Sequence, residues 1–568
     1  MTVPGAVHEL VSKFDQHRKE YQTHKNETEL RREFLDPFFE ALGWDVFNKK
    51  SYSERFKEVM HEASVEVEGQ AKAADYAFRV GDKTIFLVEA KKPSVNIGIN
   101  PETAFQLRRY GWSAKLPISI LTDFEQLAVY ECQTKPSKTD KASYGRIKMY
   151  HYSEYVEKWD EIAEVFSYSA VMKGAFENFV EGTKGKKGTE QVDDAFLEEI
   201  ERWRDMLARN IVLRNEQIQT EREVNFAVQM IIDRIIFLRI GEDRGIEPEG
   251  QLQHIGNGTQ IYRELVALFR RADTRYNSGL FHFSEEKGQS SSPDSLTPGL
   301  QIDDKVLKDI LRNLYYPESP YVFTYLSADI LGQVYERFLG KVIRLTAGHQ
   351  AKVEEKPEVR KAGGVYYTPT YIVNYIVENT VGKLLEGKTP QQAVSIKVLD
   401  PACGSGSFLL GAYQYLLDWH VRWYSENGPE KWAKGSSPVV YQAVGGDWRL
   451  TTPEKKRILL DNIHGVDIDA QAVEVTKLSL LLKVLEGESG QLRLGFERAL
   501  PDLGANIKCG NSLIGPDYYE EHQSTLGFAD DADRYRVNAF DWKAEFPTVF
   551  IQGGFRGALV RSFPYRPA

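Results

Sequence analysis

The stretch that decides the fold of this chain is Val398-Leu399-Asp400-Pro401-Ala402-Cys403-Gly404-Ser405-Gly406-Ser407-Phe408. The apolar run 396–399 predicts a buried parallel strand, and the apolar pattern that begins at Phe408 predicts a helix. Gly404 and Gly406 lie between them and predict a turn at which a ligand can approach the backbone. Strand, glycine turn and helix in this order are typical of a doubly wound sheet that binds a nucleotide-like ligand at its carboxyl edge. For the glycine loop alone, an ordinary tight turn is the alternative.

Three further segments accompany this stretch. Gly-Gly-Val-Tyr-Tyr-Thr-Pro occupies 363–369, an apolar run at 463–469 predicts a second strand that ends in acid, and 507–513 predicts a third strand. A carboxylate at the end of the second strand is suited to accept hydrogen bonds from ribose hydroxyls. We expect Asp469, in the same segment, to cap the following helix instead.

In this order the four segments resemble the motifs of S-adenosylmethionine (SAM)-dependent DNA methyltransferases of the adenine-N6 class. The resemblance implies a Rossmann-like methyltransferase core, in which a polar residue after the third strand reads the adenine amino group. Tyr366 and Pro369 either border the methionine end of SAM or serve in packing. The SAM-binding residues that the resemblance implies are Tyr366, Thr368, Asp400, Ala402, Gly404, Gly406, Asp467, Ile468 and Asn511.

The first part of the chain predicts a different α/β unit. An amphipathic helix opens at Asn26 and ends at Gly43. Strands are expected at 74–78, 84–91, 118–122 and 127–130. Asp75 and Glu89 then lie on the adjacent strands of one hairpin. Lys91 shares a face with Glu89, because side chains alternate along a strand.

Two carboxylates and an ammonium on one face of a buried strand pair are costly unless they have a function. The carboxylates can bind Mg²⁺, which polarises a phosphate and helps to form hydroxide, while the lysine stabilises charge or orients the attacking water. The alternative is a surface Glu–Lys pair on an edge strand. Asp75, Glu89 and Lys91 resemble the PD-(D/E)xK nuclease motif.

Two further elements extend that resemblance. On the next predicted helix, Gln106 and Tyr110 resemble the Gln-x-x-x-Tyr motif of nucleases of the type I restriction and RecB-like kind, and Glu27 resembles the acidic residue of their first helix. The resemblance implies Asp75 and Glu89 as metal ligands. The catalytic set that it implies is Asp75, Glu89, Lys91, Gln106, Tyr110 and Glu27. Basic neighbours that either contact phosphates or are solvated surface charges are Lys92, Arg108 and Arg109.

A helical spacer is expected between these units, from about 153 to 345. Its longest helices are predicted at 196–211 and 224–241, and a further helix at 327–345. Arg234 and Arg239 either face DNA or, as we favour, are solvated surface charges.

We therefore expect an α/β multi-domain fold with domains at 1–150, 151–345 and 346–568. They are a PD-(D/E)xK nuclease α/β core, an all-helical spacer and an incomplete Rossmann-like SAM-dependent methyltransferase core. This order resembles the single-chain type IIG and IIL restriction–modification enzymes.

The methyltransferase resemblance lacks one motif. Adenine-N6 enzymes carry Asp/Asn-Pro-Pro-Tyr/Phe after the next strand, where it binds the flipped base. This chain enters that region at 546–555 and reaches only Phe563-Pro564-Tyr565 before Ala568. A target-recognition domain is also missing. A truncated, a frame-shifted and a naturally short chain remain open explanations. We expect SAM binding to persist and methyl transfer by this chain to fail or to be very slow.

Composition is that of an ordinary globular protein. The 568 residues suffice for about three or four domains, with 42% apolar and 27% charged residues. No apolar run approaches the roughly 18 residues needed to span a membrane, and the N-terminus carries no secretory pattern. The three cysteines lack metal-ligand spacing and predict a reducing cytoplasm. A net charge of -10 gives no global nucleic-acid signal but permits a local basic stripe.

Three functions are consistent with these patterns. The favoured one is a restriction–modification protein that uses Mg²⁺ and SAM on double-stranded DNA, with a second protomer needed for double-strand cleavage. The second is a nuclease whose SAM domain only senses the ligand. The third is a non-catalytic remnant that binds SAM or DNA.

Overall fold

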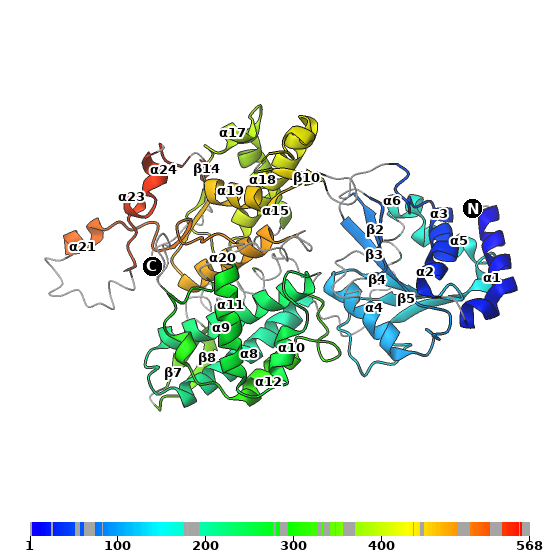
Figure 1. Ribbon diagram of the computed structural model, residues 1–568, viewed down its shortest axis with the longest axis horizontal. Coiled ribbons are helices and arrows are strands. Elements are labelled where there is room, and N and C mark those ends of the chain that lie inside the picture. Colours follow the sequence, from blue (N-terminus) through cyan, green and yellow to red (C-terminus); the bar gives the residue numbers. More distant parts are fainter. Residues whose placement is uncertain are drawn as a thin grey trace.

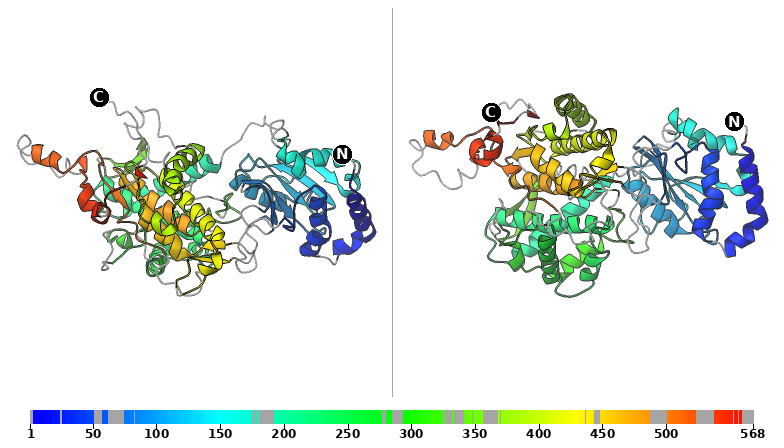
Figure 2. Two further views of the ribbon diagram at one scale, coloured as in Figure 1. Left: turned by 90° about the horizontal axis from the view of Figure 1, so that it is seen from above. Right: turned by 45° about the horizontal axis from the view of Figure 1, so that its top comes forward.

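The computed structural model shows three parts along the chain (Figure 1). It describes residues 3–23, 26–50, 57–61, 74–81, 83–174, 176, 179, 192–276, 280–284, 293–323, 325, 332, 341–346, 348–355, 368, 370–435, 437–442, 448–486, 500–522, 537–551, 553–555 and 557–558. The N-terminal part, blue to cyan, lies at one end of the molecule, and the green and yellow-to-orange parts pack side by side at the other (Figures 1 and 2).

The N-terminal part is built on a six-stranded sheet in sequential order β1 to β6. Its strands are β1 (Val59–His61), β2 (Tyr76–Val80), β3 (Lys83–Ala90), β4 (Ile118–Thr122), β5 (Gln126–Glu131) and β6 (Arg146–His151). The four predicted strands are present, and β1 and β6 were missed. Strand β3 pairs antiparallel with β2 and parallel with β4, so it is an interior strand and the edge-strand alternative is wrong.

Helices cover both faces of this sheet. One face carries α1 (Gly5–Thr23), α2 (Glu27–Leu30), η1 (Arg31–Leu35), α3 (Asp36–Ala41), η3 (Tyr152–Glu154), α5 (Trp159–Phe166) and α6 (Tyr168–Met172). The other face carries α4 (Pro101–Ser113), the crossover between β3 and β4. The core of the first face continues past residue 150, as far as Phe176. Phe86 and Val88 point into that core and Leu87 toward the α4 side, so Glu89 lies on the α4 side as well.

The predicted helix from Asn26 to Gly43 is present but contains a wide turn. Asn26 caps it by accepting from the Glu29 amide at 2.9 Å, and Gly43 ends it with φ of +88°. The middle of the helix, η1, is a π-helical turn. Pro37 follows this turn and has no amide hydrogen for the regular ladder, which explains the local change of pitch.

The green part is mostly helical and is called the connector below. Its helices are α8 (Val192–Arg214), α9 (Glu221–Asp243), α10 (Gln251–Gly256), α11 (Ile261–Tyr276), η4 (Thr297–Gly299) and α12 (Asp304–Arg312). It also contains an antiparallel hairpin, β7 (Lys341–Leu345) with β8 (Ala351–Glu355). The helix predicted at 327–345 is therefore wrong for 341–345, where buried Ile343 next to exposed Arg344 fits a strand, while 327–331 and 333–340 lie outside the described residues.

The third part is built on a parallel four-stranded sheet in the order β13-β12-β9-β14. Its strands are β9 (Val398–Asp400), β12 (Ile463–Asp467), β13 (Ile507–Cys509) and β14 (Gly557–Ala558), with a separate hairpin of β10 (Val440–Gln442) and β11 (Trp448–Leu450). Its helices are α15 (Thr370–Val377), η5 (Glu378–Gly382), α16 (Lys383–Leu385), α17 (Pro390–Ala393), α18 (Ser407–Glu426), η6 (Pro429–Lys431), α19 (Thr452–Asn462), α20 (Ala470–Val484), α21 (Asp517–His522), α23 (Trp542–Glu545) and α24 (Pro547–Ile551).

One hydrophobic core joins the connector to this sheet. It runs from the apolar face of α8 and α9 through α18 and α20 to the strands. Helix α9 packs on α20, and the Arg244 guanidinium donates to the Leu482 carbonyl at 3.2 Å (Figure 1). None of the helices that the structure describes combines the length and apolar character that a membrane crossing needs.

Candidate functional site

Asp75, Glu89 and Lys91 meet at the open end of the β2–β3 hairpin. The register pairs Tyr76 with Val88, so its continuation places Asp75 opposite Glu89. The Asp75 carboxylate accepts from the Ala90 amide at 2.7 Å, and the Lys91 ammonium donates to Glu89 Oε1 at 2.5 Å. Asp75 and Glu89 are buried, and Lys91 is largely shielded, with 17% of its side chain exposed.

One oxygen of the acid pair has no hydrogen-bond partner. Glu89 Oε2 is buried and has no hydrogen-bond partner. Burial and then the charge of Asp75 raise the pKa of Glu89 well above its usual range, although Lys91 opposes the shift. Burial is the largest single influence and acts to lower the pKa of Lys91, but the charge and hydrogen bond of Glu89 and the charges of Glu27 and Asp75 together outweigh it, so the net shift is upward. An orphaned carboxylate oxygen beside a second carboxylate is an environment that a bound cation would stabilise.

Arg31 and Glu27 complete this group of charges. The Arg31 guanidinium donates to the Asp75 carboxylate at 3.0 Å and to the Asp75 carbonyl at 3.2 Å. Glu27, one helical turn before Arg31, acts electrostatically on both Glu89 and Lys91. Among the residues that the structure describes, no cluster of three or more acidic, histidine or cysteine side chains is close enough to hold a metal. The two carboxylates nevertheless suit Mg²⁺, which keeps several waters and takes one or two protein carboxylates.

Gln106 and Tyr110 approach the same group from α4. They lie one turn apart, and the Gln106 amide donates to the Tyr110 hydroxyl at 3.1 Å. Burial, then the charge of Glu89, raises the pKa of Tyr110. The structure therefore brings Glu27, Asp75, Glu89, Lys91, Gln106 and Tyr110 into one neighbourhood, while their catalytic roles stay predictions.

Four arginines do not behave as predicted. Arg108 is buried and donates to Asp140 at 2.6 Å, and Arg109 is buried and donates to the Tyr321 carbonyl of the connector at 2.9 Å. Arg234 pairs with Asp294 at 2.8 Å, and Arg239 pairs with Asp243 at 2.5 Å, both in the interior. Neither phosphate contact nor surface solvation describes them. Sequence periodicity cannot show that a distant carboxylate will pair a buried guanidinium.

The glycine loop lies at the carboxyl edge of β9 and β12. The Gly404 amide donates to Asp467 Oδ2 at 2.8 Å, and the Asp469 amide donates to Asp467 Oδ1 at 2.9 Å. The Cys403 amide donates to the Val466 carbonyl at 2.9 Å, which ties the loop to β12. Both oxygens of Asp467 are thus held by backbone amides, each with further acceptor capacity.

Gly404 and Gly406 have backbone φ angles that a residue with a Cβ adopts only with strain. Their φ angles are +53° and +85°. A Cβ at Gly406 would lie 2.7 Å from the Thr476 methyl group. The Thr476 hydroxyl on α20 donates to the Gly404 carbonyl at 2.8 Å. The loop is therefore packed against α20, and the close approach of Thr476 together with the positive φ accounts for glycine at position 406.

The other residues of the expected SAM site are spread along this edge. Asp400 accepts from the Ala402 amide at 3.1 Å, and Asn511 accepts from the Leu513 amide at 3.1 Å. Ile468 is 54% exposed beside Asp467. Thr368 is buried, and Tyr366 lies outside the described residues.

Asp469 accepts from the Gln471 amide at 2.9 Å, which confirms its predicted capping role. The segment 546–555 does not itself form the next strand. Residues 547–551 form α24, and the parallel neighbour of β9 is β14, at 557–558. Phe563-Pro564-Tyr565 lies outside the described residues.

Sequence reasoning missed two side chains of these sites. Arg31 had a signal, because it lies four residues after Glu27 and so on the same helix face. Thr476 had none, since it lies 72 residues after the glycine loop and reaches it only through the packing of α20.

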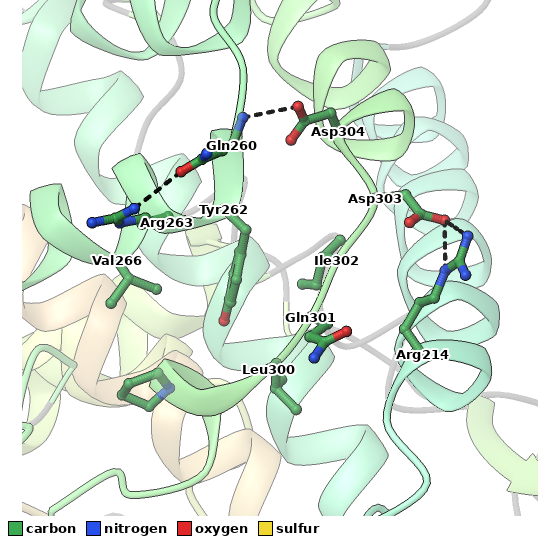
Figure 3. Close-up of a pocket in the computed structure, with 11 residues that line it drawn as sticks. Arg214, Gln260, Tyr262, Arg263, Val266, Leu300, Gln301, Ile302, Asp303 and Asp304 are labelled. Carbon is green, nitrogen blue, oxygen red and sulfur yellow. Dashed lines mark hydrogen bonds and ion pairs between the residues drawn. The ribbon is translucent and has the colours of Figure 1, made fainter.

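A cavity of about 500 Å³ lies elsewhere, in the connector (Figure 3). Its charged groups already have protein partners. Arg214 pairs with Asp303 at 3.0 Å, the Gln260 backbone amide donates to Asp304 at 2.9 Å, and Arg263 donates to the Gln260 side-chain oxygen at 3.1 Å. The cavity is therefore lined by polar groups that already pair with one another at the ends of α8, α11 and α12. Its residues are distant in the sequence from Asp75, Glu89 and Asp467.

Two protein-family models match the chain. Residues 24–138 match "Type I restriction enzyme R protein N terminus (HSDR_N)", and residues 380–528 match "MmeI, DNA-methyltransferase domain". The first match includes the Asp75 and Glu89 strands, and the second includes the glycine loop and Asp467.

Curated relatives match over longer stretches. The chain is 36% identical over 518 residues to the type II restriction enzyme and methyltransferase RM.Eco57I of Escherichia coli, covering 90% of this chain and 50% of that protein. It is 27% identical to the putative type II restriction enzyme and methyltransferase RM.MjaORFECS2P of Methanocaldococcus jannaschii, covering 55% of this chain and 29% of the relative. The chain thus spans half the length, or less, of these relatives.

The solved structure of the type IIL restriction-modification enzyme MmeI in complex with DNA is also similar, at 15% identity over 59% of this chain and 46% of that one. Its TM-score of 0.32 is too low to carry an argument. The sequence matches are therefore the basis of the comparison: over 90% of its length the chain is similar to a type II restriction enzyme and methyltransferase, and its two family-model matches lie in the order restriction-enzyme domain, then methyltransferase domain.

Proposed function

We propose that the chain acts on double-stranded DNA as a restriction–modification protein, with a Mg²⁺-dependent endonuclease site at Asp75 and Glu89 and a SAM site at the glycine loop. The observation that carries the nuclease half is the buried acid pair on an interior strand, where Glu89 has an orphaned oxygen and Lys91 lies beside it. Such a group is costly to bury without a cation. The family matches support both halves.

Asp75 and Glu89 would hold the metal. Mg²⁺ bound there supplies a positive charge that polarises a DNA phosphate and lowers the pKa of a bound water. Lys91 is held against Glu89 and can orient that water or stabilise the developing charge. Gln106 and Tyr110 border the site from α4 and can position the scissile phosphate. Arg31 fixes the Asp75 carboxylate on its other side.

For the second half, Asp467 would accept hydrogen bonds from the ribose hydroxyls, and the loop of Gly404 and Gly406, tied to Asp467 by the Gly404 amide, would border the ligand. SAM supplies an electrophilic methyl group when it is bound. Asn511 lies at the end of β13, the neighbour of β12, where a polar side chain can read the adenine.

Plasmid cleavage tests the nuclease half. We expect wild-type protein to cut DNA with Mg²⁺ and not with EDTA, and Lys91→Ala to lose cleavage by about a hundredfold or more. Lys83→Ala is the matched control, because Lys83 is an exposed lysine at the opposite end of the same strand. Equal activity of wild type and Lys91→Ala would contradict the proposal.

Incubation with tritiated SAM tests the other half on the same polypeptide. We expect saturable binding of SAM to this polypeptide. Cutting that depends on SAM without a methyl mark would favour the SAM-sensing alternative. Absence of SAM binding would contradict the second half of the proposal.

A further inference from the structure

A segment of the connector runs between α9 and the N-terminal part. It comprises residues 314–323 together with Tyr325, and is called the strap below. On the α9 side, the Arg239 guanidinium donates to the Leu314 carbonyl at 3.0 Å, and the Phe323 amide donates to the Asp243 carboxylate at 3.0 Å. The ion pair between Arg239 and Asp243 thus anchors both ends of the strap on one helix.

The other side of the strap binds α4, the helix that carries Gln106 and Tyr110. The Arg109 guanidinium donates to the Tyr321 carbonyl at 2.9 Å, and the Val322 amide donates to the Ser113 hydroxyl at 3.0 Å. The rings of Trp112 and Tyr321 lie 5.6 Å apart. All of these groups are buried, so the contact is a fixed joint rather than a loose surface encounter.

Tyr325 contacts the backbone next to the acid pair. Its hydroxyl oxygen accepts from the Ala74 amide at 3.1 Å, across 251 residues of chain. Ala74 immediately precedes Asp75. The Tyr325 ring packs edge-on against Tyr110 at 6.1 Å, within a small apolar cluster that also includes Leu87 and Val322.

The electrostatics agree with this placement. Burial raises the pKa of Tyr325, and the charges of Glu89 and Asp75 contribute to the same shift. The hydroxyl therefore lies within the field of both carboxylates. It can fix the backbone that enters β2 and so the direction of the Asp75 carboxylate, which Arg31 and the Ala90 amide fix from the other side.

We propose that Tyr325 is a positioning residue of the nuclease site, so that the connector completes a metal site whose ligands all come from the N-terminal part. This inference rests on the proposed nuclease function. Tyr325 acts through Ala74 and Asp75 and does not itself touch the substrate. The strap would then strengthen cation binding at Asp75 and Glu89.

The test is Tyr325→Phe in the full chain, which keeps the ring and removes the acceptor of the Ala74 amide. Mg²⁺ binding is measured directly by titration calorimetry, and the Mg²⁺ dependence of plasmid cleavage is measured in parallel. We expect about tenfold weaker Mg²⁺ binding, as for other partners that orient a metal ligand. Saturating Mg²⁺ should restore most of the cleavage rate, which a general loss of structure would not allow.

Tyr316→Phe is the matched control. Tyr316 also lies on the strap, and its hydroxyl donates to Glu102 on α4 at 2.9 Å, but it is 40% exposed and has no contact with the acid pair. We expect this variant to bind Mg²⁺ as the wild type does. If Tyr325→Phe proves unfolded by circular dichroism, Ser113→Ala replaces it, because it releases the Val322 amide and should weaken Mg²⁺ binding in the same direction.

Glu89→Gln distinguishes a failure of the proposed nuclease function from a failure of the positioning role of Tyr325. If wild-type protein shows no Mg²⁺ binding that depends on Glu89, the proposed nuclease function fails and the role of Tyr325 fails with it. If Mg²⁺ binding depends on Glu89 but Tyr325→Phe leaves it unchanged, only the positioning role is refuted.

Discussion

Asp467 and Glu89 both stand at the ends of interior strands in α/β sheets, yet their surroundings are opposite. Asp467 has a backbone amide on each carboxylate oxygen, from Gly404 and Asp469. Glu89 has one oxygen paired with Lys91 and the other buried without a partner, next to a second carboxylate. The first carboxylate is held on both oxygens by backbone amides, and the second keeps one buried oxygen without a hydrogen-bond partner.

This difference indicates which kind of ligand each site can bind. A carboxylate organised by amides keeps its shape without a ligand and can accept hydrogen bonds from a neutral hydroxyl. A buried carboxylate pair is stabilised by a cation and destabilised without one. The following predictions test this contrast, from the largest expected effect to the smallest.

Removing the orphaned carboxylate should have the largest effect. We expect Glu89→Gln to reduce Mg²⁺-dependent plasmid cleavage by more than about a hundredfold, since loss of a direct ligand should exceed the loss of an orienting partner. The same variant should bind SAM with unchanged affinity in a calorimetric titration. A parallel loss of SAM binding would erase the contrast between the two sites.

Filling the glycine loop should have the next largest effect. In Gly406→Ala the new Cβ meets Thr476 at 2.7 Å, and the φ of +85° strains any residue with a Cβ. We expect SAM affinity to fall by about tenfold or more, measured by calorimetry, with cleavage in Mg²⁺ retained. Gly387→Ala is the control, because Gly387 has a φ of +69° but open space around its Cβ. Equal losses in both variants would assign the effect to backbone strain alone.

Mg²⁺ should stabilise only one of the two sites. At a Mg²⁺ concentration about a hundredfold above its Kd, linkage predicts about 2.7 kcal/mol of added stability for the unit that holds Asp75 and Glu89. The thermal unfolding transition of wild-type protein should therefore move upward with Mg²⁺ and return with EDTA. Glu89→Gln should show no such shift, and an equal shift in the variant would place the cation elsewhere.

The smallest effect is expected on thermal stability at Asp233 of α9, whose buried carboxyl group can be compared with that of Glu89. One of its oxygens is also buried without a partner, and burial raises its pKa to about 7. The Gln229 amide, which donates at 2.6 Å, and Arg234 oppose the shift, while Glu474 of α20 adds to it.

The sign of the pH effect follows from linkage. The folded protein holds the Asp233 proton up to about pH 7, and the unfolded chain releases it near 3.8, the ordinary pKa of an aspartic acid side chain. The stability that this proton contributes is therefore complete below the unfolded pKa and is lost as the pH rises through the folded value. We expect Asp233→Asn to raise the unfolding temperature relative to wild type by more at pH 8 than at pH 5. A gain of equal size at both pH values would contradict the shift.

Local patterns predicted much of the fold. Alternation and apolar runs predicted the four central strands of the first sheet, and the same reasoning placed β9, β12 and β13 with their glycine turn and helices. Turn and cap chemistry predicted Asn26, Gly43 and Asp469, because capping depends on residues within a few positions. The short strands β1 and β6 and the β7–β8 hairpin escaped, since edge and hairpin strands carry weak periodic signals.

By itself, the sequence determined the order of the units, the acid pair with its lysine, the glycine loop and the similarity to a type II restriction enzyme and methyltransferase. Only the tertiary structure decided that Arg108, Arg109, Arg234 and Arg239 are buried partners rather than surface charges. It also decided that Thr476 supports the glycine loop and that Tyr325 of the connector reaches Ala74. The physical reason is that burial and pairing depend on groups that are distant in the chain, and their position is fixed only when the cores pack.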